Sequence, residues 1–293
     1  MPGGRKVGGL VVQRALEMVM PFDRKFFFPD NTDADWAPHL GWLAPDAYDP
    51  KADALIFPMQ SYVVRTSHHT VLIDTCVGNH KDRPTRPQWH QKTDRVYLDA
   101  IAAIGLGPED IDYVFCTHLH GDHAGWNTKL EDGRWVPTFP KARYVFSKKE
   151  VETWRDVPHP KFTRATLEDS VLPVIEAGRA VLVGNDWALD DEVRLEATPG
   201  HTPDHVAVRF DSKGASAVMS GDLMHSPVQC LHPEWRPWPD WDPEVAAATR
   251  RAFLERYCET STLVCTAHFP LPSAGRIERA GEAFRFVADA ERW

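Results

Sequence analysis

The chain has 293 residues, a formal net charge of −9 and 43% hydrophobic residues. This apolar content can build a sizeable core and excludes a disordered chain, while the acidic balance argues against a nucleic-acid partner because phosphate backbones are also negative. The five cysteines are scattered without a CxxC pair, which excludes a disulfide framework and a thiolate zinc finger. No run approaches the roughly 18 uninterrupted apolar residues of a membrane span, so no membrane association is expected.

The N-terminal region, residues 1–55, is expected to form an arm on a single domain that spans residues 1–293. Its beginning, MPGGRKVGGLVVQRALEMVMP, has basic residues and then an apolar run, but Arg14 and Glu17 interrupt the run and no small-residue cleavage site follows. We therefore expect a cytoplasmic protein. Residues 22–58 are rich in proline, aromatic residues and aspartate, which favours an irregular segment wrapped over the body.

Strand and helix patterns follow one another along the rest of the chain. SYVVRT (61–66) and TVLIDT (70–75) are β-rich runs separated by SHH and predict a hairpin. Residues 94–106 have apolar side chains near helical spacing until Gly105 and Gly107 end the pattern, and residues 243–258 predict a helix with proline in its first turn. Further strands are expected at 112–118, 142–147, 193–201, 205–210, 216–222 and 262–268.

Histidine and aspartate recur where these expected strands end, and both are ligands that zinc prefers. In HLHGDH, His118 and His120 are two residues apart and can point at one metal ion, whereas Asp122 and His123 are adjacent and diverge toward a second. A two-metal site needs about six or seven ligands. Three other strand ends each supply one candidate, namely His201 in TPGHTPDH, Asp222 in SGDLMH and His268 in TAHFP.

This ordered set resembles the metallo-β-lactamase superfamily, whose pattern is HxHxDH followed by His, Asp and His. The resemblance covers roughly residues 55–275 and implies an α+β fold, a four-layer αββα sandwich with two metal ions in a cleft between the sheets. It implies that one ion is bound by His118, His120 and His201, the other by Asp122, His123 and His268, and that Asp222 bridges them. Asp74, in LIDT, matches a family position that orients a metal-bound histidine.

Two divalent ions, with Zn²⁺ expected, can hold a bridging water as hydroxide and polarise the oxygen of an electrophile. Asp122 and Asp222 are therefore candidate catalytic residues as well as ligands. Trp126 and His225 flank the ligand segments and are candidates for contacts around the ligands or with the substrate. The ligand set indicates hydrolysis of a small molecule, but it does not choose the bond.

The ligand segments HLHGDHAGW, TPGHTPDH and GDLMHSPVQ are most similar to the branch that contains N-acyl homoserine lactonases and methyl parathion hydrolase. We therefore expect a metal-dependent hydrolase that opens a lactone or carboxylic ester, with phosphotriesters as the alternative. A β-lactamase-like enzyme, a glyoxalase II-like thioesterase and a mononuclear iron dioxygenase are further alternatives. A homodimer is left open.

The aromatic residues offer two interpretations. Trp235, Trp238 and Trp241 follow Asp222, and a further group, Phe26, Phe27, Phe28, Trp36 and Trp42, crowds the N-terminal arm. They either pack the arm onto the body or line an apolar pocket suited to an uncharged or acyl-bearing substrate. No cluster of basic residues is evident, so no cationic clamp is expected in that pocket.

Overall fold

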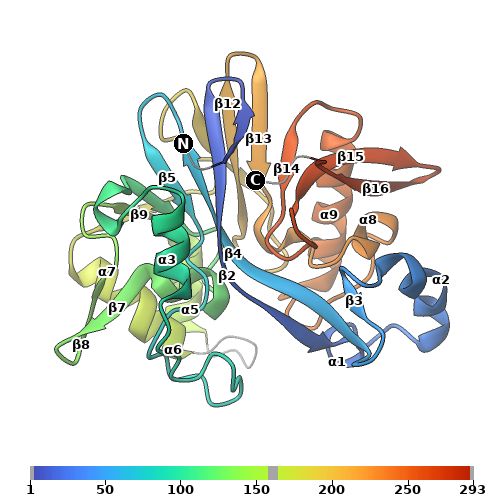
Figure 1. The fold of residues 1–293 in the computed structure, drawn as a ribbon, viewed down its shortest axis with the longest axis horizontal. Helices are drawn as coiled ribbons and strands as arrows, with labels where there is room; N and C mark the ends of the chain where they lie inside the picture. The colour runs from blue at the N-terminus through green and yellow to red at the C-terminus, as the bar shows by residue number, and fades with distance from the viewer. Residues whose placement is uncertain (1–2, 158–163, 291–293) are drawn as a thin grey trace.

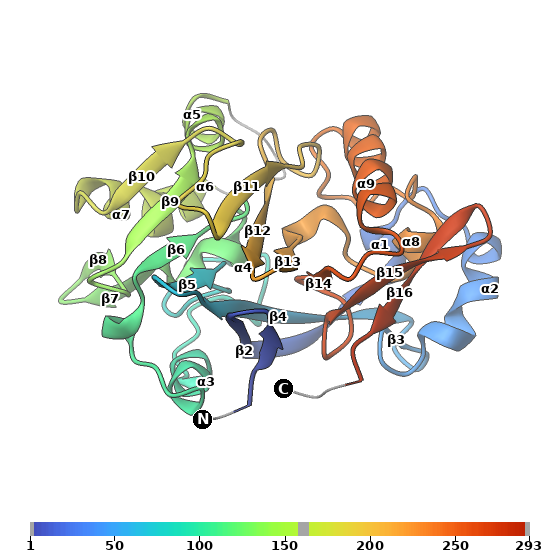
Figure 2. The same ribbon diagram turned by 90° about the horizontal axis from the view of Figure 1, so that it is seen from above.

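The computed structural model describes residues 3–157 and 164–290, which form two stacked β-sheets with helices on both outer sides (Figure 1 and Figure 2). The first sheet has the order β1 (Arg5–Val7), β2 (Leu10–Asp23), β4 (Ala54–Arg65), β5 (Thr70–Ile73), β6 (Tyr113–Phe115), β9 (Arg143–Ser147) and β10 (Ala180–Val183), and β3 (Tyr48–Asp49) pairs with β4. The second has the order β11 (Val193–Ala197), β12 (Val206–Ser212), β13 (Ala215–Met219), β14 (Leu263–Cys265), β15 (Ala274–Ala280) and β16 (Ala283–Ala288). The expected αββα architecture is confirmed.

Helices cover the outer faces of the two sheets (Figure 2). The first sheet is covered by α3 (Val96–Ala103), α5 (Lys148–Asp156), α6 (Arg164–Thr166), a π-helical turn (Leu167–Val171) and α7 (Leu172–Glu176), and the second by α8 (Val228–Leu231) and α9 (Pro243–Tyr257). A small hairpin, β7 (Thr128–Glu131) with β8 (Arg134–Pro137), lies beside the first group. Among the described residues, none of the helices has both the length and the apolar character needed to cross a bilayer.

The layer between the sheets is apolar on both sides. Val64, Val71 and Phe115 of the first sheet pack against Val208 and Phe210 of the second, and all five are almost fully buried. Burying such a side chain contributes about 1.5–3 kcal/mol each, which holds the two sheets together. The strand ends at the edge of this layer are therefore fixed in position.

The hairpin predicted at 61–75, the helices near 94–106 and 243–258 and the six further strands are confirmed, with bounds that differ from the predicted ones. Parallel pairing joins β5 to β6 and β6 to β9 in the first sheet, and β13 to β14 in the second. Because parallel strands end at the same edge of a sheet, the residues that follow them lie close together.

The expectation that residues 1–55 form an arm on the domain is wrong in its first half. Residues 10–23 form β2, a 14-residue strand of the first sheet that pairs with β4 from Val11 to Asp23. The polar residue Glu17, which breaks the apolar pattern, is buried and accepts hydrogen bonds from the backbone N–H of Val77 (2.7 Å) and from Trp126 Nε1 (2.8 Å). The buried carboxylate of Glu17 is therefore satisfied by hydrogen bonds from residues distant in the sequence.

The part that extends beyond the sheets is helical. It contains α1 (Arg24–Phe27) and α2 (Asp33–Leu43) and lies at the far end of the long β2–β4 pair (Figure 1). A capping box between Thr32 and Asp35 begins α2, and Trp36 packs edge-on against Trp235 with ring centroids 4.8 Å apart. Pro38 removes one helical hydrogen bond from α2. The capping box and the burial of Trp36 stabilise the helix by more than this loss.

Candidate metal centre

Strand ends from both sheets bring the seven predicted ligands together. His118 follows β6, His201 follows β11, Asp222 follows β13 and His268 follows β14. The chain continues from His118 into the short helix α4 (Gly121–Ala124), which carries Asp122 and His123. Gly221, with φ +52°, precedes Asp222, and a Cβ there would lie 2.6 Å from His205 Nε2, so only glycine fits.

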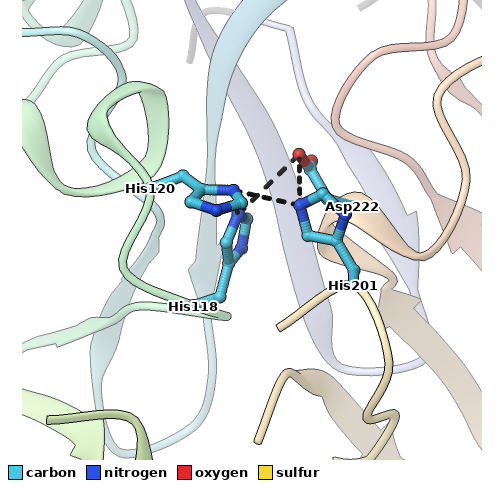
Figure 3. Close-up of side chains that lie close together, drawn as sticks. All are labelled: His118, His120, His201 and Asp222. Atoms are coloured by element: carbon cyan, nitrogen blue, oxygen red, sulfur yellow. Dashed lines mark hydrogen bonds and ion pairs between the residues drawn. The ribbon is translucent and has the colours of Figure 1, made fainter. Parts of the chain in front are cut away.

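The first ligand group contains His118, His120, His201 and one oxygen of Asp222 (Figure 3). The Nδ1 atom of His120 lies 3.0 Å from the Nε2 atoms of both His118 and His201. Oδ2 of Asp222 lies 3.4 Å from His201 Nε2 and 3.8 Å from His118 Nε2. Three imidazole nitrogens and a carboxylate oxygen thus face one common point, a donor set typical of zinc.

The second group contains Asp122, His123 and His268, whose ligand atoms all lie within 4.8 Å of one another. Oδ2 of Asp122 lies 3.7 Å from His268 Nε2 and 3.9 Å from His123 Nε2. The other oxygen of Asp222, Oδ1, lies 3.0 Å from both of these imidazole nitrogens. Asp222 therefore presents one oxygen to each group.

The buried donor atoms fit a pair of metal ions. His123 Nε2 and Asp222 Oδ1 are both buried and lie 3.0 Å apart, yet neither makes a hydrogen bond of acceptable geometry. A buried polar atom without a well-formed hydrogen bond costs about 1–3 kcal/mol, so such a pair facing one point indicates a ligand that would satisfy both. A divalent cation bound there would do so, and the residues present would hold it.

Asp74 lies behind the ligands, at the position where the resemblance implies an orienting carboxylate. It follows β5 with a left-handed backbone (φ +57°), and its Oδ2 lies 2.9 Å from Nδ1 of His123. Its Oδ1 accepts the backbone N–H of Thr117 at 2.8 Å, and the Thr117 hydroxyl lies 3.1 Å from Nδ1 of His118. One carboxylate thus fixes imidazoles of both groups.

Asp240 has the same role for His201, and the sequence reasoning missed it. It is fully buried, with Oδ1 2.9 Å from Nδ1 of His201 and Oδ2 3.4 Å from the buried guanidinium of Arg250. His268 is oriented by a backbone group instead, since its Nδ1 lies 2.9 Å from the carbonyl oxygen of Pro58 in β4. The only sequence signal for Asp240 was its place in RPWPDWDP, a segment whose tryptophans suggested a pocket wall rather than a metal contact.

The protonation states of the buried histidines favour the binding of metal cations. Burial lowers the pKa of His118, His120 and His201 well below the ordinary imidazole value, so these side chains are neutral ligands. Burial also opposes the charged form of His123, but Asp222, Asp74 and Asp122 outweigh it and raise its pKa well above the usual value. A metal ion would take the place of that proton, so metal affinity is expected to fall as the pH falls.

The other predicted residues divide between the site and the core. His225 Nε2 lies 3.2 Å from Oδ2 of Asp222 and its ring stacks on His268, so His225 belongs to the site. The structure does not bring Trp126 there, because this indole is buried against Tyr97 and donates to Glu17. Trp126 is a core residue that supports β2, and its predicted place around the ligands or substrate is corrected.

A cavity of about 180 Å³ opens onto the ligands. Its wall includes Asp122, Asp222, His120, His225 and His268 together with the aromatic residues Phe22, Phe27, Phe57, Trp89 and Trp238. Both interpretations of the aromatic residues are thus partly right, since Phe27 and Trp238 line the pocket while Trp235 and Trp36 pack the arm.

The expectation of a pocket without a cationic clamp did not anticipate two arginines in its wall. Arg83 and Arg86, in the segment between β5 and α3, both line the cavity. Arg83 is buried and forms a bidentate ion pair with Asp169, 86 residues further along the chain. A pair so distant in sequence could not be recognised before the fold was known.

A family comparison identifies the class of protein. Residues 57–268 match the model of the metallo-beta-lactamase superfamily, a stretch that is more than half of the chain and contains all seven ligand positions. The chain therefore belongs to the metallo-β-lactamase superfamily.

Relatives within the superfamily include lactonases. An N-acyl homoserine lactonase of Bacillus sp. is 24% identical over 179 residues, which cover 57% of this chain and 64% of that protein. The match thus spans less than two thirds of the relative. An N-acyl homoserine lactonase of Bacillus thuringiensis is 20% identical over 226 residues, covering 73% of this chain and 82% of that protein. The predicted resemblance to this branch is confirmed.

Two solved structures share the fold over nearly the whole chain. The structure of AidC, a dizinc quorum-quenching lactonase with a bound product, superposes with a TM-score of 0.79 at 21% identity, covering 99% of this chain and 98% of AidC. The hydrolase AbOPH superposes with a TM-score of 0.84 at 22% identity, again covering 99% and 98% of the two chains. At this identity the likeness concerns the fold.

Proposed function

We propose that this chain is a metal-dependent hydrolase that uses two divalent ions, zinc for preference, to open a lactone or carboxylic ester. The observation that carries the proposal is the position of Asp222, whose two carboxylate oxygens face two separate groups of ligands. The lactonase relatives and the dizinc lactonase of the same fold support this choice of bond. When bound, two such ions supply an activated water and polarise a carbonyl oxygen.

The side chains around the ions have separate tasks in this proposal. Asp222 fixes the distance between the two ligand groups, while Asp74 and Asp240 hold His123 and His201 in one tautomer and orientation. Asp122 is the most exposed of the carboxylates at the site and faces the cavity, where it can accept a proton as the ring or ester opens.

His225 is placed to act on the substrate. Its Nε2 lies against Asp222, its ring lines the cavity, and its Nδ1 is buried without a hydrogen bond. We infer that it positions the substrate next to Asp222. The aromatic wall excludes water around an apolar part of the substrate, which strengthens the polar interactions at the reacting carbonyl.

Metal analysis and a hydrolysis screen test the proposal together. Protein purified without chelator is expected to contain about two transition-metal ions per chain, and Asp222→Ala is expected to lose activity by orders of magnitude with at least one weakened metal site. The screen compares kcat/KM for lactones, aryl esters, thioesters, phosphotriesters and a cephalosporin. A single iron ion per chain would support a mononuclear iron dioxygenase instead. A kcat/KM for the best phosphotriester a hundredfold above that of every lactone and ester would support a phosphotriesterase.

The location of the protein is a separate proposal. All five cysteines are free, and four of them are buried, as expected for thiols kept in a reducing compartment. We propose a cytoplasmic location on this ground.

A further inference from the structure

The pocket has a second polar region beside the ligands, built on the segment between β5 and α3. Four residues of this segment line the cavity: Arg83, Thr85, Arg86 and Trp89. The segment is held in place by backbone hydrogen bonds, from His80 N to the carbonyl of Lys92 (2.7 Å) and from Gln91 N to that of Lys81 (2.9 Å). These bonds fix the two ends of the segment that carries the four side chains.

Arg83 is held from behind and keeps one donor free. Its Nη1 and Nη2 donate to the two oxygens of Asp169 at 2.8 and 3.0 Å, and Nη1 also donates to the carbonyl of Asp82 at 2.9 Å. Its side chain is 4% exposed, yet its Nε makes no hydrogen bond. A Cβ built on Gly121, beside the ligand Asp122, would lie 3.5 Å from this Nε, so the free donor is next to the metal centre.

The cluster behind Arg83 places two basic side chains around one carboxylate. Lys81 is fully buried and shares Asp169 with Arg83, its Nζ lying 3.7 Å from Oδ1, while it donates to Thr128 Oγ1 at 2.7 Å. Burial lowers the pKa of Lys81 to about 7, so near neutral pH its amine is only partly charged.

Arg86 adds a second guanidinium to the same wall. Its central carbon lies 5.7 Å from the ring centroids of both Phe22 and Trp89, so two aromatic rings hold it by cation–π contact. These contacts leave its N–H edges available for a planar acceptor. A carboxylate matches both arginines because guanidinium groups bind it with short, charge-assisted hydrogen bonds.

We propose that Arg83 and Arg86 recognise a carboxylate on the substrate, a short distance from the bond that is cleaved. The inference rests on the proposed function and narrows it to lactones or esters that carry a carboxylate. Arg83 lies beside the metal ligands, so the acyl portion between the two groups is short. The aromatic rings of Phe27 and Trp238 then contact the remaining apolar part.

Calorimetric titration of the metal-loaded protein tests this inference without requiring hydrolysis. The probes are the straight-chain dicarboxylates from malonate to adipate, each compared with its own monoamide. In both members of a pair one carboxylate can bind the metals, so only the second end differs. The best dicarboxylate is expected to bind at least tenfold more tightly than its monoamide.

Substitutions assign the difference to the two arginines. In Arg83→Gln, the dissociation constants of each dicarboxylate and its monoamide are expected to differ by no more than about twofold. In Arg86→Gln, the ratio of these two constants is expected to fall in part. Arg95→Gln removes an exposed charge outside the pocket and should leave the ratio unchanged. Arg86→Gln breaks no ion pair between described residues and is expected to fold, so it tests the idea even if Arg83→Gln does not fold.

Any of three results would overturn the proposal. One is equal binding of dicarboxylate and monoamide at every chain length, and the other is an unchanged ratio in the folded arginine variants. Tighter binding of the monoamides would indicate a neutral amide acceptor and equally refutes it. A protein that shows the expected ratio but hydrolyses no lactone or ester would instead contradict the proposed function alone.

Discussion

Replacing Asp240 by asparagine is expected to weaken one metal site and spare the other. Asp240 contacts His201 at 2.9 Å, and His201 belongs to the group with His118 and His120. Removing such an orienting partner typically weakens metal affinity by about 10–100-fold, or about 1.4–2.7 kcal/mol. Asparagine keeps an acceptor oxygen for the imidazole, so we expect the lower end, about tenfold.

The same change should cost little folding stability. Arg250, which loses a carboxylate at 3.4 Å, keeps three carbonyl acceptors, those of Pro233 (2.8 Å), Leu223 (3.1 Å) and Trp235 (3.1 Å). Breaking a buried ion pair outright costs about 3–5 kcal/mol, and with these remaining acceptors we expect about 1–2 kcal/mol. The variant can therefore be studied as a folded protein.

Competition with a fluorescent zinc chelator measures two dissociation constants for each variant. In Asp240→Asn only one should rise, whereas in Asp74→Asn both should rise, because Asp74 contacts His123 directly and His118 through Thr117. Asp242→Asn, two residues from Asp240, is the matched control, since asparagine also serves as an N-cap for α9. Equal weakening of both sites by Asp240→Asn would refute the assignment of His201 to a single ligand group.

Three further predictions concern the pH response, the ligand loop and the pocket. Burial raises the pKa of Glu150 from 4.5 to about 7, so its contribution to the free energy of unfolding is complete below pH 4.5 and lost as the pH rises through about 7. The loss of unfolding free energy is on the order of 3 kcal/mol. When the free energy of unfolding in urea is plotted against pH, Glu150→Gln should give a flatter curve than the unchanged protein. The same slope in both proteins would mean that other groups cause the pH dependence. Gly125→Ala places a Cβ 1.9 Å from the carbonyl oxygen of Val77, so it should lower both thermal stability and metal content, and normal values of both would disprove the close packing. Trp238→Ala should change the relative kcat/KM of long-chain and short-chain acyl substrates while metal content stays constant, and an unaltered ratio would remove Trp238 from the substrate wall.

The sequence predicted the metal site better than its surroundings, for physical reasons. The ligands follow short apolar strands whose pattern is local, so His118 to His123 and His201 could be placed at strand ends from the sequence. β2 was missed because Glu17 interrupts its apolar pattern, and the partners that satisfy Glu17 lie far along the chain. α2 was missed because Pro38 argues against a helix that a capping box and tertiary packing stabilise.

The polar residues of the pocket wall were beyond prediction for another reason. Arg83 lies in an irregular segment rich in proline and charge, where no period marks which side chain points inward. Its partner Asp169 lies in the π-helical turn at Leu167–Val171, a feature without a sequence signature of its own. Only the packing of the helices on the first sheet brings these two residues together.

The placement of His268 against β4 has a consequence for how selectivity could evolve. Phe57 and Met59 line the cavity, while the carbonyl of Pro58 between them orients His268 and Gln60 donates to the carbonyls of Thr266 and Ala267. Mutations that enlarge the pocket by moving this strand would therefore sacrifice metal retention, a trade-off that laboratory selection would meet early. Side-chain changes in α1 and at Trp238 itself avoid this constraint, so new substrate ranges should arise there first.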